Sequence, residues 1–381
     1  MKILVISNLF PPQVIGGYER AIADYSNLLH QKGHEIYVCT SDTQGLVTSY
    51  RTMGNHPFTV ERSLKLVIQW KEEGIIILPT AQAMPLMLEN IETIEHCLEN
   101  YQPDIVLVGN AEGLNIEVIG KPIERGIPVI HYVMNAHAGY TPELTPNSDL
   151  FCCVALSQWI AENLRRLGYP FAKIPVIYPG VRPEEFYCES KFEFDYLRIA
   201  YSSLVMHYKG ADVLVDALYL LHDAGVNFSA AIAGGSLDPD YVKTLQDFCQ
   251  EKGMADKVKF TGLLTKAQLK ELYQASNVLV FPSRFQEPFG ISQIEAMMAG
   301  LLLVTSGTGG SGEAIEDGIS GLLFPSEDCY ALAEILNYLA INPSEWQRIA
   351  IAGQKRALTY FTMERTVQEL ESLMRDMIAL K

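Results

Sequence analysis

The chain has 381 residues, of which 48% are hydrophobic and 19% charged, and its 29 basic and 45 acidic side chains give a formal net charge of −16. This composition excludes a disordered chain and a coiled coil, and the length predicts about two or three globular domains. Because so acidic a surface repels nucleic-acid backbones, we expect no nucleic-acid partner, and an anionic ligand would need a locally built site.

The cysteine pattern and the N-terminus predict a cytoplasmic protein. The seven cysteines are odd in number, and no two of them have the C-x-x-C spacing, which argues against a zinc site and a disulfide framework. The first apolar run is followed at once by Asn8 and two prolines, as in a buried strand rather than a signal peptide. No apolar stretch of about 18 residues occurs, so we expect no transmembrane segment.

Apolar strand-like runs alternate with amphipathic helix-like runs along the first half of the chain. Continuous apolar runs such as KILVIS are typical of strands that are covered on both faces. The predicted strands are 2–7, 35–41, 75–80, 104–110, 128–133, 151–156 and 176–181, and the predicted helices include 19–33 and 157–168.

The alternation restarts after a polar stretch, residues 182–195. The predicted strands of this half are 197–203, 229–235, 257–262, 277–283 and 301–307, with helical segments between them. Two successive series of this kind predict an α/β protein with two Rossmann-like, doubly wound parallel-sheet domains, at 1–180 and 181–362. Such sheets bind ligands at the carboxyl ends of their strands, so we expect the site in a cleft between the two domains.

A pair of glycines, Gly16 and Gly17, follows the first strand. Glycine lets a ligand approach the backbone, and the N-terminus of the next helix offers N–H groups to an anion. A plain tight turn explains the same residues equally well.

A lysine, Lys209, stands before a glycine and a predicted helix in the segment HYKG. Its ammonium group could contact a phosphate as a point charge. By itself, the segment is also typical of a solvated lysine at the start of a helix.

The segment PSRFQEPFGISQIEAMMAG (282–300) is the most specific motif. Glu287 lies in the loop after a strand, and Glu295 lies on the helix that follows. Ionised carboxylates only accept hydrogen bonds, which suits pairs of sugar hydroxyls, and Gly290 lets the loop approach a ligand. Two unrelated surface carboxylates are the alternative interpretation.

His137, which follows the strand 128–133, is a further candidate, because a histidine there can donate to a ligand oxygen. It could equally be a satisfied loop histidine. The segment GTGGSG (307–312) satisfies G-x-G-x-x-G, but it lies in the last strand–helix step rather than the first, which argues against an NAD-dependent oxidoreductase.

The order of these motifs resembles that of the retaining glycosyltransferases of family 4, which have the GT-B fold. The similarity covers nearly the whole chain, and its most specific parts are the Lys-Gly segment and the two glutamates with seven residues between them. It implies that the terminal helix, 363–381, crosses back onto the first domain. It also implies a hexosyltransferase-type enzyme that needs no metal or other cofactor.

The resemblance implies a role for each matching residue. Lys209 would neutralise the departing diphosphate, Glu287 would hold the donor sugar, Glu295 would bind the ribose, and His137 would contact the sugar from the first domain. Lys209, Glu287 and His137 are therefore the expected catalytic residues. The expected donor-binding residues are Gly16, Gly17, Ser203, Lys209, Gly234, Gly262, Leu264, Phe289, Gly290, Ile291 and Glu295.

The chain departs from the family at Ser202-Ser203-Leu204, where Gly-Arg-Leu is usual, so a second cation for the diphosphate is missing. The resemblance favours a UDP-sugar as the donor, with guanosine and adenosine nucleotides left open, and implies a hydroxyl acceptor on a small molecule, a glycan or a glycolipid. Two alternatives stay open: a sugar-nucleotide-binding protein with weak or no catalysis, and a phosphorylase-type enzyme of the same fold.

Overall fold

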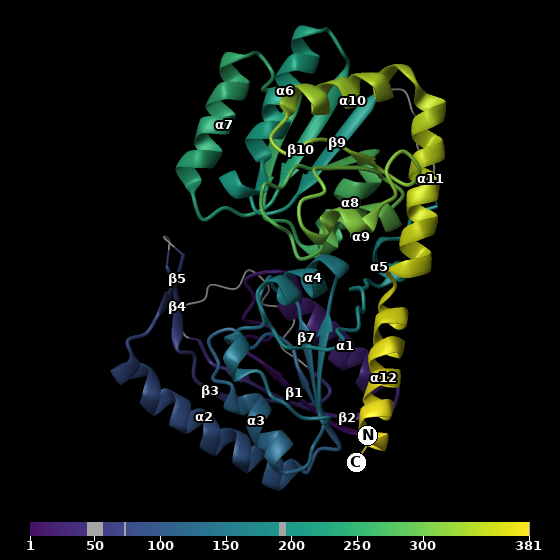
Figure 1. Ribbon diagram of the computed structural model, residues 1–381. Helices are drawn as coiled ribbons and strands as arrows, with labels where there is room; N and C mark the ends of the chain where they lie inside the picture. The colour runs from purple at the N-terminus through teal and green to yellow at the C-terminus, as the bar shows by residue number, and fades with distance from the viewer. Residues whose placement is uncertain (44–55, 72–73, 190–195, 381) are drawn as a thin grey trace. The chain divides into compact units, whose positions relative to one another are not determined.

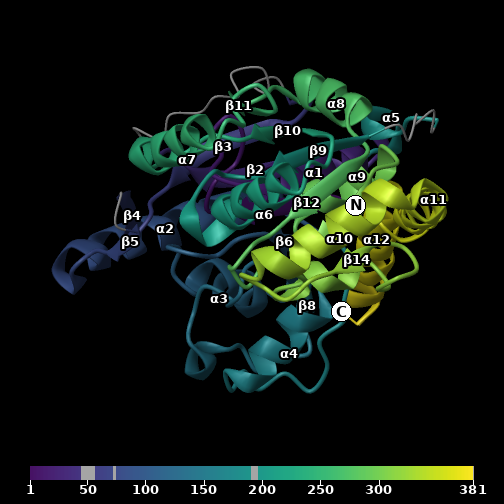
Figure 2. The ribbon, with the colours of Figure 1, turned by 90° about the horizontal axis from the view of Figure 1, so that it is seen from above.

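The computed structural model describes residues 1–43, 56–71, 74–189 and 196–380. The chain packs into two compact units, the first formed by Met1–Pro179 with Met363–Lys381 and the second by Gly180–Thr362. Figures 1 and 2 show the elements of each unit in two views, and each unit is described by itself below. Of the predicted polar stretch 182–195, residues 190–195 lie outside the described part of the chain.

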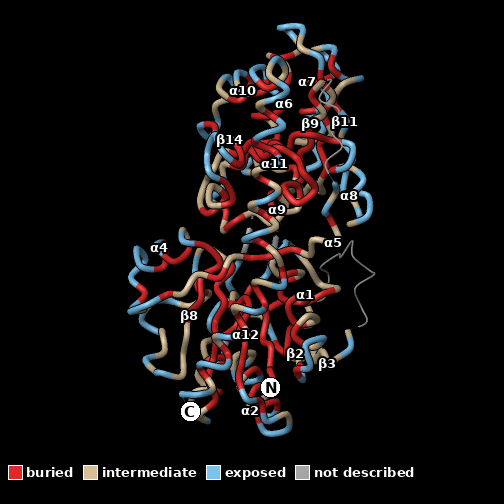
Figure 3. The backbone as a smooth tube through the Cα atoms, turned by 90° about the vertical axis from the view of Figure 1, so that its right-hand side faces the viewer, coloured by how far each residue is buried: buried red, intermediate tan, exposed pale blue. Residues whose placement is uncertain are grey.

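The first unit contains a six-stranded parallel sheet in the order β3-β2-β1-β6-β7-β8. Its central strands are apolar on both faces because both faces are covered, and Figure 3 shows them as buried. The strands are β1 (Lys2–Ser7), β2 (Glu35–Ser41), β3 (Thr59–Leu64), β6 (Ile105–Val108), β7 (Val129–Val133) and β8 (Phe151–Ala155).

Helices pack on this sheet, among them the last helix of the chain. One core joins Leu4 and Ile6 of β1 to the apolar residues of α2 and α3. The terminal helix α12 contacts α1, and the Glu371 carboxylate on α12 lies 3.2 Å from the ammonium group of Lys32. The helices of this unit are α1 (Gly17–Gln31), α2 (Thr80–Tyr101), α3 (Glu117–Glu124), α4 (Gln158–Arg166) and α12 (Met363–Ala379).

The second unit repeats the architecture with a parallel sheet in the order β11-β10-β9-β12-β13-β14. Helices α6 and α10 lie side by side and share one core with the strands, while α9 contacts β12 and α8 contacts β9 (Figure 1). The strands are β9 (Leu197–Ser202), β10 (Phe228–Ala233), β11 (Val258–Gly262), β12 (Val278–Phe281), β13 (Leu302–Thr305) and β14 (Leu322–Leu323). The helices are α5 (Pro183–Phe186), α6 (Ala211–Asp223), α7 (Pro239–Glu251), α8 (Lys266–Ala275), α9 (Ile291–Met298), α10 (Cys329–Ile341) and α11 (Pro343–Tyr360).

Three segments before residue 182 differ from the prediction. The expected strand 75–80 is wrong: β5 (Gly74–Ile77) pairs antiparallel with β4 (Ile68–Lys71), outside the main sheet, and α2 begins at Thr80. The expected strand 176–181 is reduced to isolated bridges at Val176 and Val181. The polar strand β3 was not predicted at all, because its sequence, TVERSL, has no continuous apolar run.

In both sheets the strand order reverses beside the first strand, between β1 and β6 and between β9 and β12. In open α/β sheets, ligands bind at such a reversal, just beyond the carboxyl ends of the two strands. The loops after β9 and β12 are therefore the first place to look for a site in the second unit.

Candidate functional site

Lys209 and Glu287 meet beyond the strand reversal of the second unit. Lys209 follows β9 and Glu287 follows β12, and the Lys209 ammonium nitrogen lies 2.5 Å from Oε1 of Glu287. The hydroxyl of Ser283 donates to the same carboxylate oxygen over 2.6 Å. The two side chains are only 14% and 7% exposed, so this is a largely buried ion pair.

The turn that carries Lys209 is fixed to the loop that carries Glu287. The backbone N–H groups of Arg284 and Phe285 both donate to the carbonyl oxygen of Tyr208, each over 3.0 Å. Gly210 has φ +71°, and a Cβ there would lie 2.0 Å from the carbonyl oxygen of Pro282. The segment therefore requires its glycine because the two loops are in backbone contact.

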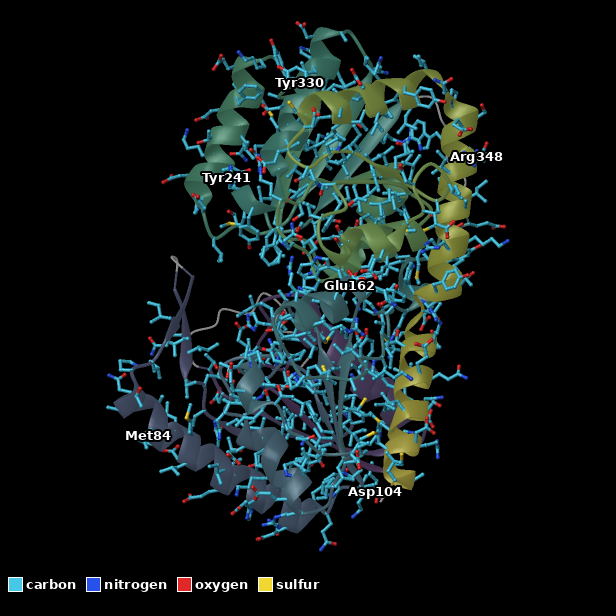
Figure 4. The ribbon with its side chains drawn as sticks, viewed as in Figure 1. Met84, Asp104, Glu162, Tyr241, Tyr330 and Arg348 are labelled. Atoms are coloured by element: carbon cyan, nitrogen blue, oxygen red, sulfur yellow. The ribbon has the colours of Figure 1, made fainter. Side chains whose placement is uncertain are left out.

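A half-buried arginine, Arg284, strengthens this attachment. Its guanidinium group donates twice to the carboxylate of Asp212, each time over 2.7 Å, and once to the carbonyl oxygen of His207. The hydroxyl of Tyr241, labelled in Figure 4, donates to Asp212 as well. Although burial raises the pKa of Asp212, hydrogen bonds from Arg284 and Tyr241 bring it below its ordinary value, so the carboxylate stays ionised.

The GTGGSG segment packs on the backbone of the Glu287 loop. The N–H of Gly310 donates to the carbonyl oxygen of Glu287 over 2.7 Å, and Gly309 and Glu287 form an isolated β-bridge. Gly309 has φ +65°, and a Cβ there would lie 2.3 Å from that carbonyl oxygen. These glycines allow one loop to approach another.

The N-terminus of α9 follows the loop directly. Gly290 is the N-cap residue with φ +93°, and Ile291 is the first residue of the helix. Phe289 is 1% exposed and its ring packs on that of Phe361, so the whole residue, backbone included, is buried in this structure. The buried amide of Gln293 donates to the carbonyl oxygen of Phe289 over 2.8 Å, which fixes the start of the helix.

Three further predicted donor-binding residues meet at the carboxyl ends of β9, β10 and β11. The N–H of Gly234 donates to the carbonyl oxygen of Gly262 over 2.9 Å, and the N–H of Ser203 donates to that of Ala233. A Cβ on Gly234 would lie 1.7 Å from the carbonyl oxygen of Ser203, whereas one on Gly262 would meet no atom within 4 Å. Leu264 follows this strand end and is half-buried.

Glu295 lies on α9 next to the end of β9. The hydroxyl of Tyr273, on α8, donates to the Glu295 carboxylate and lies 2.7 Å from the hydroxyl of Ser202. Tyr273 is fully buried, and burial, followed by the nearby Glu295 charge, raises its pKa well above the ordinary value.

The predicted residues of the first unit lie beyond its own strand reversal. The N–H of Gly16 donates to the carboxylate of Glu19 over 3.0 Å, and the N–H of Ile15 donates to the same group. Glu19 is fully buried, and burial raises its pKa. A carboxylate of the chain therefore already accepts the Gly16 N–H, and the predicted role of Gly16 in donor binding stays a prediction. Gly17 is exposed at the start of α1.

His137 is half-exposed in the loop after β7, and its Nε2 lies 3.6 Å from the carboxylate of Glu112. The amide of Asn135 donates to the other oxygen of Glu112 over 3.4 Å. The backbone of Glu112 is in turn held by hydrogen bonds from Asn8 and to Asn110, at the ends of β1 and β6. No sequence motif pointed to Glu112.

Comparison with known proteins identifies the family. The sequence pattern described as "Glycosyltransferase Family 4" matches residues 15–185, and that described as "Glycosyl transferases group 1" matches residues 189–356. An uncharacterized glycosyltransferase of Methanocaldococcus jannaschii is 34% identical over 345 residues, which cover 84% of each chain. This chain is a group 1 glycosyltransferase of the GT-B type.

Other relatives and solved structures agree with this assignment. A D-inositol 3-phosphate glycosyltransferase of Thermobifida fusca is 26% identical over 68% of this glycosyltransferase and 66% of its own length. Sucrose-phosphate synthase of Thermosynechococcus elongatus has the same fold, with a TM-score of 0.79, 18% identity and full coverage of both chains. HepE of Anabaena, solved in complex with UDP, has a TM-score of 0.77 at 19% identity and covers 99% of this chain and 100% of its own.

The described part of this glycosyltransferase contains no group of three or more His, Cys, Asp or Glu side chains arranged to hold a metal ion. Within the same residues, no helix combines the length and the apolar composition that crossing a membrane requires. The sequence motifs did not single out Ser283, Arg284, Asp212 or Tyr273. Ser283 contacts Glu287 within its own loop, whereas the contacts of Arg284 with Asp212 and of Tyr273 with Ser202 join segments that are distant in the chain.

Proposed function

We propose that this glycosyltransferase transfers a hexosyl group from a nucleotide-diphosphate sugar, preferably a UDP-sugar, to a hydroxyl acceptor with retention of anomeric configuration. The observation that carries the proposal is the largely buried Lys209–Glu287 pair, which lies beyond the reversal between β9 and β12 and beside the N-terminus of α9. A cation, a carboxylate and a helix N-terminus are the groups that a sugar diphosphate needs.

Each group has a distinct part in the proposed reaction. Charge builds on the diphosphate as the glycosidic bond breaks, and the ammonium of Lys209, which has three N–H donors, stabilises that charge with the N–H groups of α9. Both described hydrogen bonds to the Glu287 carboxylate end on Oε1, and Oε2 is the oxygen that we propose accepts from the donor sugar. Glu295 would accept from the ribose hydroxyls. Roles for Gly17 and His137, on the first unit, stay predictions.

The choice of UDP rests on similar structures. HepE of Anabaena, which shares the fold, was solved with UDP, with UDP and glucose, and with UDP-glucose. The acceptor is proposed only as a hydroxyl of a small molecule, glycan or glycolipid. A cytoplasmic location is proposed because all seven cysteines are free thiols.

We also propose that turnover requires no metal and no other cofactor, because Lys209 and the start of α9 supply positive charge where a metal would act. Activity that falls in excess EDTA and returns with a divalent ion would overturn this part of the proposal. Activity equal in EDTA and in buffer alone would support it.

The whole proposal is tested by calorimetry with UDP-, ADP- and GDP-sugars, followed by mass spectrometry of products and NMR of the new anomeric centre. Binding and transfer from a UDP-sugar with retention are expected. A requirement for inorganic phosphate instead of a nucleotide would favour the phosphorylase-type alternative, and donor binding without transfer to a broad acceptor panel would favour a binding protein. An inverted product would contradict retention.

A further inference from the structure

Two buried hydroxyl groups connect the end of β9 to the carboxylate of Glu295. The Tyr273 hydroxyl, on α8, lies 2.7 Å from Oγ of Ser202, the last residue of β9. The Tyr273 hydroxyl also lies 3.4 Å from the carbonyl oxygen of Ser292, on α9, and the carboxylate of Glu295, on the same helix, is close enough to raise the Tyr273 pKa through its charge and as a hydrogen-bond partner. Tyr273 is fully buried and Ser202 is 8% exposed.

The direction of these hydrogen bonds follows from the donors available. An ionised carboxylate only accepts, so Tyr273 must give its single proton to Glu295. The hydroxyl of Ser202 is then the donor toward Tyr273. The serine, the tyrosine and the carboxylate then form a series of hydrogen bonds in one direction that ends on the side chain of Glu295.

We propose that Tyr273, supported by Ser202, is a positioning residue that holds the Glu295 carboxylate in the orientation that accepts two ribose hydroxyls. The inference rests on the proposed function, in which Glu295 binds the ribose. A glutamate has several side-chain rotamers, and restricting them before binding lowers the entropy lost when the nucleotide binds. Ser202 lies in the segment that departs from the family pattern.

The tyrosine ring can be kept while its hydroxyl is removed. The ring packs on Phe186 with centroids 6.0 Å apart, so Tyr273→Phe preserves the apolar packing and deletes only the donor. Ser202→Ala removes the second hydroxyl and leaves Tyr273 able to donate, so its effect should be smaller. Tyr132→Phe is the matched control, because it deletes a fully buried hydroxyl that donates to a backbone carbonyl in the other unit.

The test measures binding of a nucleoside diphosphate by calorimetry, with and without its ribose hydroxyls. The probe is whichever of UDP, ADP and GDP the wild type binds most tightly, together with its 2′,3′-dideoxy form. For the full nucleotide, Tyr273→Phe should raise Kd by about tenfold and Ser202→Ala by about threefold, as expected when a hydrogen bond to a charged group is lost. Both variants should bind the dideoxy form as the wild type does, and Tyr132→Phe should bind both forms normally.

The Glu295→Ala variant, measured in parallel, shows whether a negative result contradicts the positioning role of Tyr273 or the proposed ribose-binding role of Glu295, on which the inference rests. If Glu295→Ala loses affinity only for the full nucleotide while Tyr273→Phe matches the wild type, the positioning role is overturned and the ribose role stands. An equal loss of affinity for the full and the dideoxy nucleotide in Tyr273→Phe would also overturn the positioning role, because a general structural defect weakens the binding of both forms alike. If Glu295→Ala has no hydroxyl-dependent effect, or no diphosphate binds, the proposed function and the inference both fail.

Discussion

Replacing Lys209 by methionine should destabilise the second unit far more than the loss of an ordinary surface lysine. Methionine keeps most of the volume of the aliphatic stem but removes the ammonium group. The carboxylate of Glu287, which is 7% exposed, then keeps the Ser283 hydroxyl and loses its counter-ion. A carboxylate that is buried without its counter-ion is costly.

The expected loss in the free energy of unfolding depends on which charged group each variant leaves without its partner. Removing one partner of a buried ion pair costs roughly 3–5 kcal/mol, and the remaining Ser283 bond places Lys209→Met near the lower end, at about 3 kcal/mol. Glu287→Gln leaves the ammonium beside the rings of Phe285 and Tyr208, at 5.0 and 5.3 Å from their centroids. Because such contacts stabilise a cation, this variant should lose only about 1–2 kcal/mol. The double variant should show a coupling energy of about 2 kcal/mol.

Urea unfolding of the four proteins, followed by circular dichroism, measures this coupling energy. Lys252→Met is the matched control, because Lys252 also pairs with a glutamate and lies near two rings, but its partner Glu251 is 72% exposed. That control should change the free energy of unfolding little. A coupling energy near zero, or equal losses in Lys209→Met and Lys252→Met, would refute the reasoning. In turnover assays, Lys209→Met should lower kcat more than donor affinity.

Three further predictions concern other parts of the molecule. Glu295→Ala should weaken nucleoside diphosphate binding by about 1–3 kcal/mol, and an unchanged Kd in calorimetry would contradict the ribose role. Gly309→Ala should lower both the urea midpoint and kcat, because its Cβ would lie 2.3 Å from a backbone oxygen of the neighbouring loop. Gly318→Ala is the control, because Gly318 has φ +71° but its Cβ would meet no atom within 4 Å. It should lower the urea midpoint less, through the strain of its backbone conformation alone. The hydrogen bond from Arg375 and nearby basic groups lower the pKa of Glu371 to about 2, so its stabilising effect is present above about pH 4.5 and is lost as the pH falls toward 2. The Tm difference between the wild type and Glu371→Gln should therefore be largest near neutral pH and narrow over that interval, and a pH-independent difference would contradict the assignment.

Much of the fold could be predicted because both sheets are parallel and covered on both faces. Strands such as β1 and β12 then appear as continuous apolar runs, which are easily recognised. The edge strand β3 was missed because its residues are mostly half-buried and polar. One of its contacts with β2 is a hydrogen bond from the Tyr37 hydroxyl to the carboxylate of Glu61, which no apolar pattern reveals. The β4–β5 hairpin was misassigned because an isolated apolar run does not reveal which strand it pairs with.

The candidate site was predictable only where one short segment carries the function. The glutamates of the 282–300 segment and Lys209 were selected from local sequence, and the structure brings Lys209 and Glu287 into direct contact. The support from Arg284 and the GTGGSG loop depends on contacts between segments distant in the chain, for which one sequence gives no signal. The capping of Gly16 by Glu19 was visible in principle, because a glutamate three residues after an N-cap is the usual capping pattern.

In the proposed function, the Lys209–Glu287 pair would also explain how an acidic chain can prepare a site for an anion. A chain of net charge −16 disfavours an approaching diphosphate over most of its surface, so the positive groups must already be oriented when it arrives. Glu287 accepts one N–H of the Lys209 ammonium, whose nitrogen also lies 5.3 and 5.0 Å from the ring centroids of Tyr208 and Phe285. These contacts would hold the ammonium in place and leave its other two N–H groups for the diphosphate. Donors that do not have to reorganise stabilise a developing charge best. The Glu287 carboxylate would therefore lower the net positive charge of the site and at the same time orient the Lys209 ammonium toward the diphosphate.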